Sequence, residues 1–175
     1  MNNVESLFRE YHQPLVRYLT RRLGDRDWAE EIAQETFVRA LRQEDLQNER
    51  AWLFAVATNL IRDEARKDSR RRRHLELLAA EARAEEVEAP VDPLERAEER
   101  ALARKAIDAL GERDREALLM KEEGLNYEEI AMALELSVAS VGTTLSRARR
   151  RLVEAYEALQ AEGLKAESRT PRTGR

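Results

Sequence analysis

Apolar residues recur at steps of three and four along most of this chain, which is the spacing of an amphipathic α-helix. The first stretch shows the pattern at Val4, Leu7, Phe8, Tyr11, Leu15, Tyr18, Leu19 and Leu23. The 175 residues include only 6 glycines and 4 prolines, so few positions interrupt a helix. We therefore expect an all-α protein.

The N-terminal part of the chain predicts three helices, near residues 4–23, 27–42 and 50–73. Gly24 offers a stop for the first helix, and Pro14 is expected to kink or divide it. Helices of this kind bury their apolar faces against one another, so we expect a small helical bundle.

An acidic stretch that contains two prolines, EEVEAPVDP at 85–93, indicates a linker between two helical units. Residues 75–99 carry 2 basic and 9 acidic residues, a net charge of −7, against −4 for the whole chain. We expect a first domain over residues 1–74, an acidic and partly helical linker over 75–98, a second domain over 99–159 and a disordered tail over 160–175.

The second domain contains the pattern of a helix-turn-helix. Asn126 and Glu129 can form a capping box at the start of one helix. The turn 135–137 then leads to a second helix over 138–152, whose C-terminal part is rich in arginine and suits contact with phosphates. The spacing alone fits either a helix-turn-helix or an ordinary helical hairpin.

The residue types that catalysis or metal binding needs are sparse. The chain has no cysteine, and its 2 histidines, His12 and His74, lie far apart in the sequence. No glycine-rich phosphate loop or nucleophile set occurs, so we expect neither an enzyme nor a bound cofactor or metal. The longest apolar run is short and residues 1–30 lack a signal-peptide pattern, so we expect a cytoplasmic protein without membrane insertion.

Both units together resemble a bacterial RNA polymerase sigma factor of the extracytoplasmic-function (ECF) type. The sequences DWAEEIAQETFVRAL and AWLFAVATNLIRDEARK in the first unit resemble the sigma-2 domain of that family. The sequence LNYEEIAMALELSVASVGTTLSRARRRL in the second resembles its sigma-4 domain. The order of the two, without an intervening sigma-3 domain, strengthens the resemblance.

The resemblance implies core RNA polymerase and promoter DNA as partners, and an anti-sigma factor that holds the protein inactive. The residues that match the polymerase contact are Glu31, Gln34 and Glu35. The −10 promoter element would be read by the loop 43–49 and the third helix, with Asn48, Asn59, Arg62, Arg66, Lys67 and Arg70 as candidates. Arginines at 62, 66 and 70 are spaced by four and therefore form one basic stripe.

The −35 element would be read by the helix 138–151, with Ser140, Gly142, Thr143, Thr144, Arg147 and Arg150 as candidates. The family often has basic residues at the positions of Gly142 and Thr144, and both charges are missing here. Either the protein prefers an unusual −35 sequence, read by hydroxyl groups and DNA shape, or its affinity for that element is low and another contact compensates.

Two other functions fit the same pattern. A stand-alone transcriptional regulator would bind DNA through residues 113–152 and dimerise through the first bundle. A sigma-like helical adaptor would bind a protein partner without any promoter activity.

Overall fold

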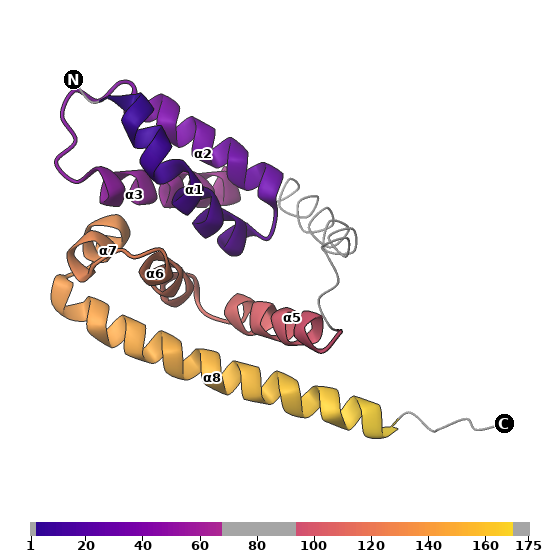
Figure 1. Cartoon of the computed structure of the whole chain (residues 1–175). Helices are drawn as coiled ribbons and strands as arrows, with labels where there is room; N and C mark the ends of the chain where they lie inside the picture. The colour runs from indigo at the N-terminus through magenta and orange to yellow at the C-terminus, as the bar shows by residue number, and fades with distance from the viewer. Residues whose placement is uncertain (1–2, 68–93, 170–175) are drawn as a thin grey trace.

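The computed structural model describes residues 3–67 and 94–169 (Figure 1). Every regular element within these residues is an α-helix, which confirms the predicted all-α fold. The helices are α1 (Val4–Leu23), α2 (Arg26–Ala40), α3 (Glu49–Lys67), α5 (Leu94–Asp108), α6 (Glu112–Glu122), α7 (Tyr127–Leu134) and α8 (Val138–Arg169). In this described part of the chain, no helix is long and apolar enough to cross a membrane.

Helices α1, α2 and α3 form the first domain. Gly24 ends α1 in the left-handed region at φ 76°, and the Asp25 side chain then caps α2 by accepting a hydrogen bond from the Trp28 backbone N–H at 3.0 Å. In the core, the Tyr18 hydroxyl bonds the Thr58 hydroxyl at 2.8 Å, and both side chains are fully buried.

Pro14 does not divide the first helix, because α1 continues through it from Val4 to Leu23. Residues on both sides of the proline, including Leu7 and Leu15, are buried in the same core. Burial of these side chains stabilises a continuous helix and outweighs the one backbone hydrogen bond that proline cannot make.

Helices α5 to α8 form the second domain. The predicted capping box is present, since Asn126 accepts from the Glu129 N–H at 2.9 Å and Glu129 accepts from the Asn126 N–H at 2.8 Å. Glu135 follows α7 in the left-handed region at φ 54° and turns the chain into α8. The two helices and this tight turn make the predicted helix-turn-helix.

Helix α5 begins at Leu94, so residues 94–98 of the predicted, partly helical linker are helical, and residues 68–93 lie outside the described part. The prediction of a disordered tail from residue 160 is wrong as far as Arg169, where α8 ends. Residues 153–162 are rich in alanine, leucine and glutamate, which favour helix, so the composition gives no reason for α8 to end before residue 160.

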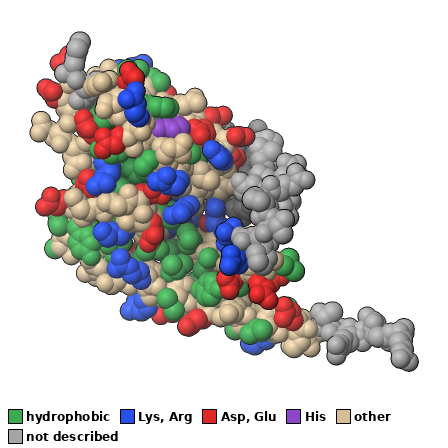
Figure 2. Space-filling view, viewed as in Figure 1, with side chains coloured by type: hydrophobic (Ala, Val, Ile, Leu, Met, Phe, Trp, Pro, Cys, Tyr) green, Lys and Arg blue, Asp and Glu red, His purple; other side chains and the backbone are tan. Residues whose placement is uncertain are grey.

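The two domains pack directly against each other. Helix α7 lies against α3 and α6 lies against α1, so buried residues of both domains join in one apolar cluster. Figure 2 shows basic and acidic side chains gathered along the junction between them.

Candidate nucleic-acid interface

The three residues predicted to bind polymerase lie together on the outer face of α2. Glu31, Gln34 and Glu35 are exposed, while their neighbours Ile32 and Ala33 are buried. Glu35 accepts a hydrogen bond from Arg39 at 2.9 Å, one turn further along the helix. These three side chains therefore point away from the core, as predicted.

A shallow groove next to this face extends it onto α3. Its lining includes Glu31 and Glu35 from α2 and Asp63 and Glu64 from α3. Trp28 fixes one wall of the groove, because its indole N–H donates to Glu64 at 2.9 Å. Sequence reasoning missed Asp63 and Glu64, since the register between two helices cannot be read from either helix alone.

The loop before α3 forms one side of a second pocket. Asn48 caps α3 by accepting from the Ala51 N–H at 3.2 Å, and it lines the pocket together with Tyr11 and Arg50. Burial, aided by a hydrogen bond with Glu10, raises the pKa of Tyr11 to about 12. Tyr11 therefore stays a neutral aromatic side chain at physiological pH, suitable for stacking on a base.

The predicted basic stripe on α3 is only partly visible. Arg62 is half-buried and donates to Glu116 of α6 at 2.5 Å, so it faces the second domain rather than solvent. Asn59 is exposed. Arg66 and Lys67 belong to α3 but their side chains are not described, and Arg70 lies outside the described residues.

On α8, the candidates for base reading differ in exposure. Thr143 and Arg150 are exposed, and Ser140 is partly exposed with its hydroxyl bonded to the Ser137 hydroxyl at 2.7 Å. Thr144 is only 5% exposed and packs inward, so its side chain is not available for a DNA contact in this structure. The prediction that Thr144 lies on the base-reading face is therefore wrong.

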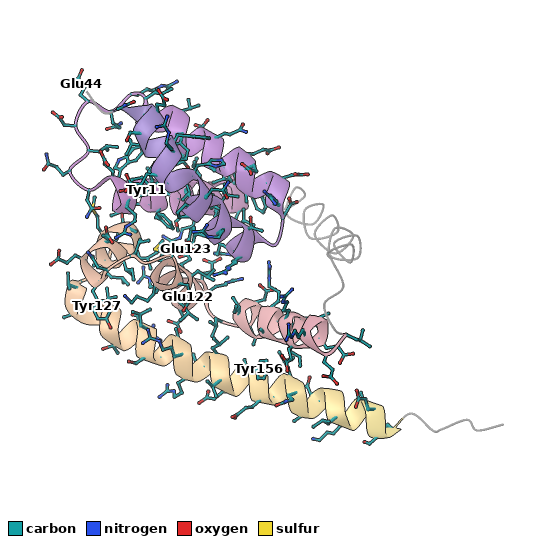
Figure 3. The ribbon with its side chains drawn as sticks, viewed as in Figure 1. Tyr11, Glu44, Glu122, Glu123, Tyr127 and Tyr156 are labelled. Carbon is teal, nitrogen blue, oxygen red and sulfur yellow. The ribbon has the colours of Figure 1, made fainter. Side chains whose placement is uncertain are left out.

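Gly142 lies opposite Tyr127, the first residue of α7, and not on the open face of α8. A Cβ atom at position 142 would meet the Tyr127 ring at 3.6 Å, which is ordinary van der Waals contact. Tyr127 itself is 41% exposed and stands beside the turn between the two helices (Figure 3). Any long side chain at position 142 would have to pass this ring to reach DNA.

Arg147 is held by a buried carboxylate. Asp114, only 3% exposed, accepts from Arg147 at 2.6 and 3.1 Å and from Arg151 at 2.9 Å. These hydrogen bonds, Arg147 first, hold the pKa of Asp114 below its usual value, while Asp114 raises the pKa of Arg147. The ion pair fixes the direction in which Arg147 leaves α8.

Comparison with known proteins places this geometry in a family. Residues 7–71 match Sigma-70 region 2 and residues 100–152 match Sigma-70 region 4. The RNA polymerase sigma factor YlaC of Bacillus subtilis is 31% identical over 157 residues, which are 86% of this chain and 90% of YlaC. The ECF sigma factor SigM of the same species is 30% identical, over 87% of this chain and 94% of SigM.

The chain belongs to the ECF RNA polymerase sigma factors. The sigma factor is also 32% identical to the ferric citrate uptake sigma factor FecI of Escherichia coli, over 82% of this chain and 85% of FecI. Its fold is similar to that of RpoE from Bartonella quintana in complex with NepR, with a TM-score of 0.62, 21% identity, and coverage of 90% of this chain and 98% of that one. The fold is also similar to that of CnrH in complex with the cytosolic domain of CnrY. The TM-score is 0.61 at 22% identity, with coverage of 89% of this chain and 88% of that one.

Membership of this family gives the function of the protein. As an alternative sigma factor, the protein joins core RNA polymerase and directs it to promoter DNA. The second matched region ends at residue 152, so the last part of α8 lies beyond it.

Proposed function

We propose that this sigma factor binds core RNA polymerase through the acidic face of α2 and its continuation on α3. The support is the exposure of Glu31, Gln34 and Glu35 on one side of a helix whose other side is buried. The groove beside them adds Asp63 and Glu64, so a basic partner would meet carboxylates from two helices. Complementary charge of this kind speeds association and selects the partner.

The −10 element is assigned to the pocket before α3 and to the outer side of that helix. Asn48 and Tyr11 line a pocket into which an unpaired base could enter, and Asn59 further along α3 is exposed. Capture of an unstacked base stabilises opened DNA, because stacking and phosphate contacts replace base pairing. The sigma factor contributes recognition and strand opening, and polymerase contributes the chemistry, so we propose no catalytic activity for this chain.

The −35 element is assigned to the exposed residues of the first turns of α8. Ser140 and Thr143 offer hydroxyl groups to base edges, and Arg147 and Arg150 lie further along the helix, where they suit phosphates. A hydroxyl group discriminates bases less sharply than a bidentate arginine does. We therefore favour an unusual −35 preference that depends partly on DNA shape.

An anti-sigma factor is the proposed regulator. Two solved structures with this fold are complexes, one of the sigma factor RpoE with the anti-sigma factor NepR and one of CnrH with the cytosolic domain of CnrY. The proposed site of action is the cytoplasm, where polymerase and promoter DNA are found.

The deciding experiment combines purified core polymerase, the sigma factor and a library of genomic promoter fragments. We expect stable binding to core and specific run-off transcripts that require the sigma factor. Duplex DNA binding by a dimer without core would instead identify a stand-alone regulator. Binding to neither DNA nor core would leave an adaptor, and either result would overturn the proposed function.

A further inference from the structure

Two arginines of α8 share one carboxylate of α6, but they use different edges of their guanidinium groups. Arg147 donates through Nε to both carboxylate oxygens of Asp114, at 3.1 and 3.2 Å, and through Nη2 at 2.6 Å. Arg151 donates to Asp114 through Nη1, at 2.9 Å, and no other acceptor for it lies within residues 3–67 and 94–169. The Nε–Nη2 edge is therefore occupied in Arg147 and open in Arg151.

The exposure of the three side chains follows the same division. The Asp114 side chain is 3% exposed, that of Arg147 is 38% exposed and that of Arg151 is 52% exposed. One buried negative charge thus faces two positive charges, and the group keeps a net positive charge on the side that water reaches. Support of the carboxylate does not account for Arg151, because Arg147 already bonds both carboxylate oxygens.

Arg151 continues the side of α8 that carries the proposed −35 contacts. Steps of three, four and four residues connect Ser140, Thr143, Arg147 and Arg151, and this spacing places them along one side of a helix. The N-terminal turns of a reading helix enter the major groove, which is about 8.5 Å deep. Arg151 stands about 16 Å beyond Ser140 along the helix axis, so it lies outside the groove, where the phosphates are.

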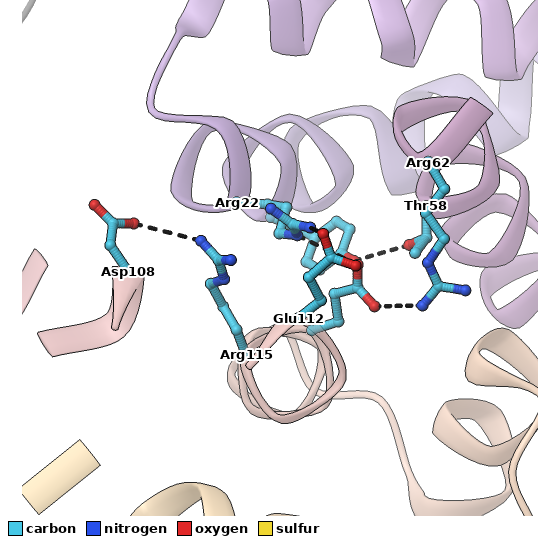
Figure 4. A network of polar contacts seen from close by, with 8 residues as sticks. Arg22, Thr58, Arg62, Asp108, Glu112 and Arg115 are labelled. Carbon is cyan, nitrogen blue, oxygen red and sulfur yellow. Dashed lines mark hydrogen bonds and ion pairs between the residues drawn. The ribbon is translucent and has the colours of Figure 1, made fainter. Parts of the chain in front are cut away.

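The contact of Asp114 lies entirely within the second domain. Two other carboxylates of α6 pair with arginines of the first domain, Glu112 with Arg22 and Glu116 with both Arg22 and Arg62 (Figure 4). Asp114 lies between them in the sequence, but both of its arginines belong to α8. The contact therefore keeps its geometry wherever the second domain is placed on polymerase and DNA.

We propose that Arg151 is a further phosphate-binding residue of the −35 interface, and that Asp114 is the residue that positions it. A guanidinium group binds a phosphate with two parallel N–H bonds, and the open Nε–Nη2 edge supplies such a pair. Asp114 holds Nη1 and orients the side chain before DNA arrives, so less side-chain ordering opposes binding. The inference rests on the proposed function, because it extends the surface assigned to the −35 element.

The two arginines then differ in what they offer to DNA. Arg147 has its Nε–Nη2 edge on Asp114 and keeps Nη1 for DNA, whereas Arg151 offers the edge that makes a two-pronged contact. A phosphate contact positions the protein and carries no sequence information. Loss of Arg151 should therefore weaken binding to every −35 sequence alike.

The test uses the sigma factor bound to core polymerase. The probe is a fluorescent duplex that carries the −35 region of a promoter recovered in the run-off experiment. Arg151→Gln removes the charge and the open edge. The matched control, Arg149→Gln, makes the same change in charge at an exposed residue of the same helix. Arg149 is two residues away and so lies on the opposite side of α8.

We expect Arg151→Gln to weaken DNA binding by about 10-fold, because charge-assisted hydrogen bonds to a phosphate are lost. The control should weaken it by less than about 2-fold, since salt screens an exposed charge that does not contact the phosphates. The slope of log affinity against log salt should become shallower by about 0.9, the value for one phosphate of duplex DNA. Arg151→Lys should keep the slope and recover only part of the affinity, because lysine has no planar fork.

Two further measurements separate a direct contact from a general effect of charge. Single phosphates of the probe are replaced by uncharged methylphosphonates, and one position should weaken binding of the wild type but not of Arg151→Gln. In an Asp114→Asn background, Arg151→Gln should reduce affinity less than it does in the wild type, because the arginine is no longer positioned. If the carboxylate instead competed with the phosphate, the effect of Arg151→Gln would grow in that background.

Several results would overturn the inference. These are an equal affinity of Arg151→Gln and the control, identical methylphosphonate profiles of wild type and variant, and an undiminished effect of Arg151→Gln in the Asp114→Asn background. Circular dichroism verifies that every variant stays helical. If Arg151→Gln does not, Arg151→Lys, which keeps a donor for Asp114, replaces it in the methylphosphonate measurement. Wild-type run-off transcription tests the proposed function separately, so its success alongside a failed Arg151 test would remove only this inference.

Discussion

Asp114, in the first turn of α6, accepts three hydrogen bonds from Arg147 of α8, the shortest at 2.6 Å. The contact joins the scaffold of the second domain to a residue proposed to bind −35 DNA. Because Arg151 also donates to this carboxylate, at 2.9 Å, one buried acid fixes two arginines on the helix. The same bond therefore serves both stability and the orientation of a binding residue.

Replacement Asp114→Asn should reduce the free energy of unfolding by about 1–3 kcal/mol, because a charged acceptor in a buried site is lost. Urea titration of the full chain, followed by circular dichroism, measures this change. The matched control is Asp63→Asn on the exposed side of α3, which should shift the midpoint little. An Asp114 variant as stable as the wild type would show that the two arginines contribute nothing to the fold.

The stability contributed by Asp114 should depend on pH. Its pKa is lower in the folded protein than the ordinary value of 3.8, so the unfolded chain takes up a proton first as the pH falls. The contribution is thus fully present above that ordinary value and is lost as the pH falls through the lowered pKa. Urea midpoints of wild type and Asp114→Asn should converge below pH 3.8, and a constant difference down to the acid limit would contradict this assignment.

At position 142, two substitutions should have separate effects. Gly142→Ala should stabilise the second domain by about 0.5–1 kcal/mol, because glycine is a poor helix former and the added Cβ meets Tyr127 at an ordinary 3.6 Å. Gly142→Arg should change or broaden the −35 preference, since it adds a positive charge to the helix proposed to read that element. Thermal unfolding measures the first effect and promoter profiling with polymerase measures the second. If the profile of the arginine variant matches that of the wild type, position 142 does not reach DNA.

Local signals predicted the ends of several helices from sequence. Gly24 closes α1, and the capping box of Asn126 and Glu129 opens α7, since each signal involves residues within one turn. The prediction that Thr144 reads DNA is wrong, and the helical period already indicates burial there. Thr144 lies three residues after Val141 and four before Ala148, and both of these residues are buried.

The contacts between the domains could not be predicted in this way. Glu116 and Arg62 are separated by 54 residues, and Glu129 and Arg50 by 79. A glutamate in an amphipathic helix is ordinarily solvated, and only the packing of α6 on α1 and of α7 on α3 buries these two. No motif marks the arginines of α1, so their ion pairs with Glu116 and Glu123 could be found only in the structure.

Charge reversal on α2 is the most direct test of the polymerase contact. Glu31→Lys with Glu35→Lys should weaken binding to core polymerase, because both carboxylates are exposed on the proposed contact face and would become repulsive to a basic partner. A loss of about 2–3 kcal/mol, or 30- to 150-fold in Kd, is expected for two reversed charges near the centre of an interface. Glu5→Lys with Glu10→Lys on α1 makes the same change in charge at exposed sites outside the groove and serves as the control. A binding titration with labelled core gives both affinities, and equal weakening by the two variants would place the contact elsewhere on the first domain.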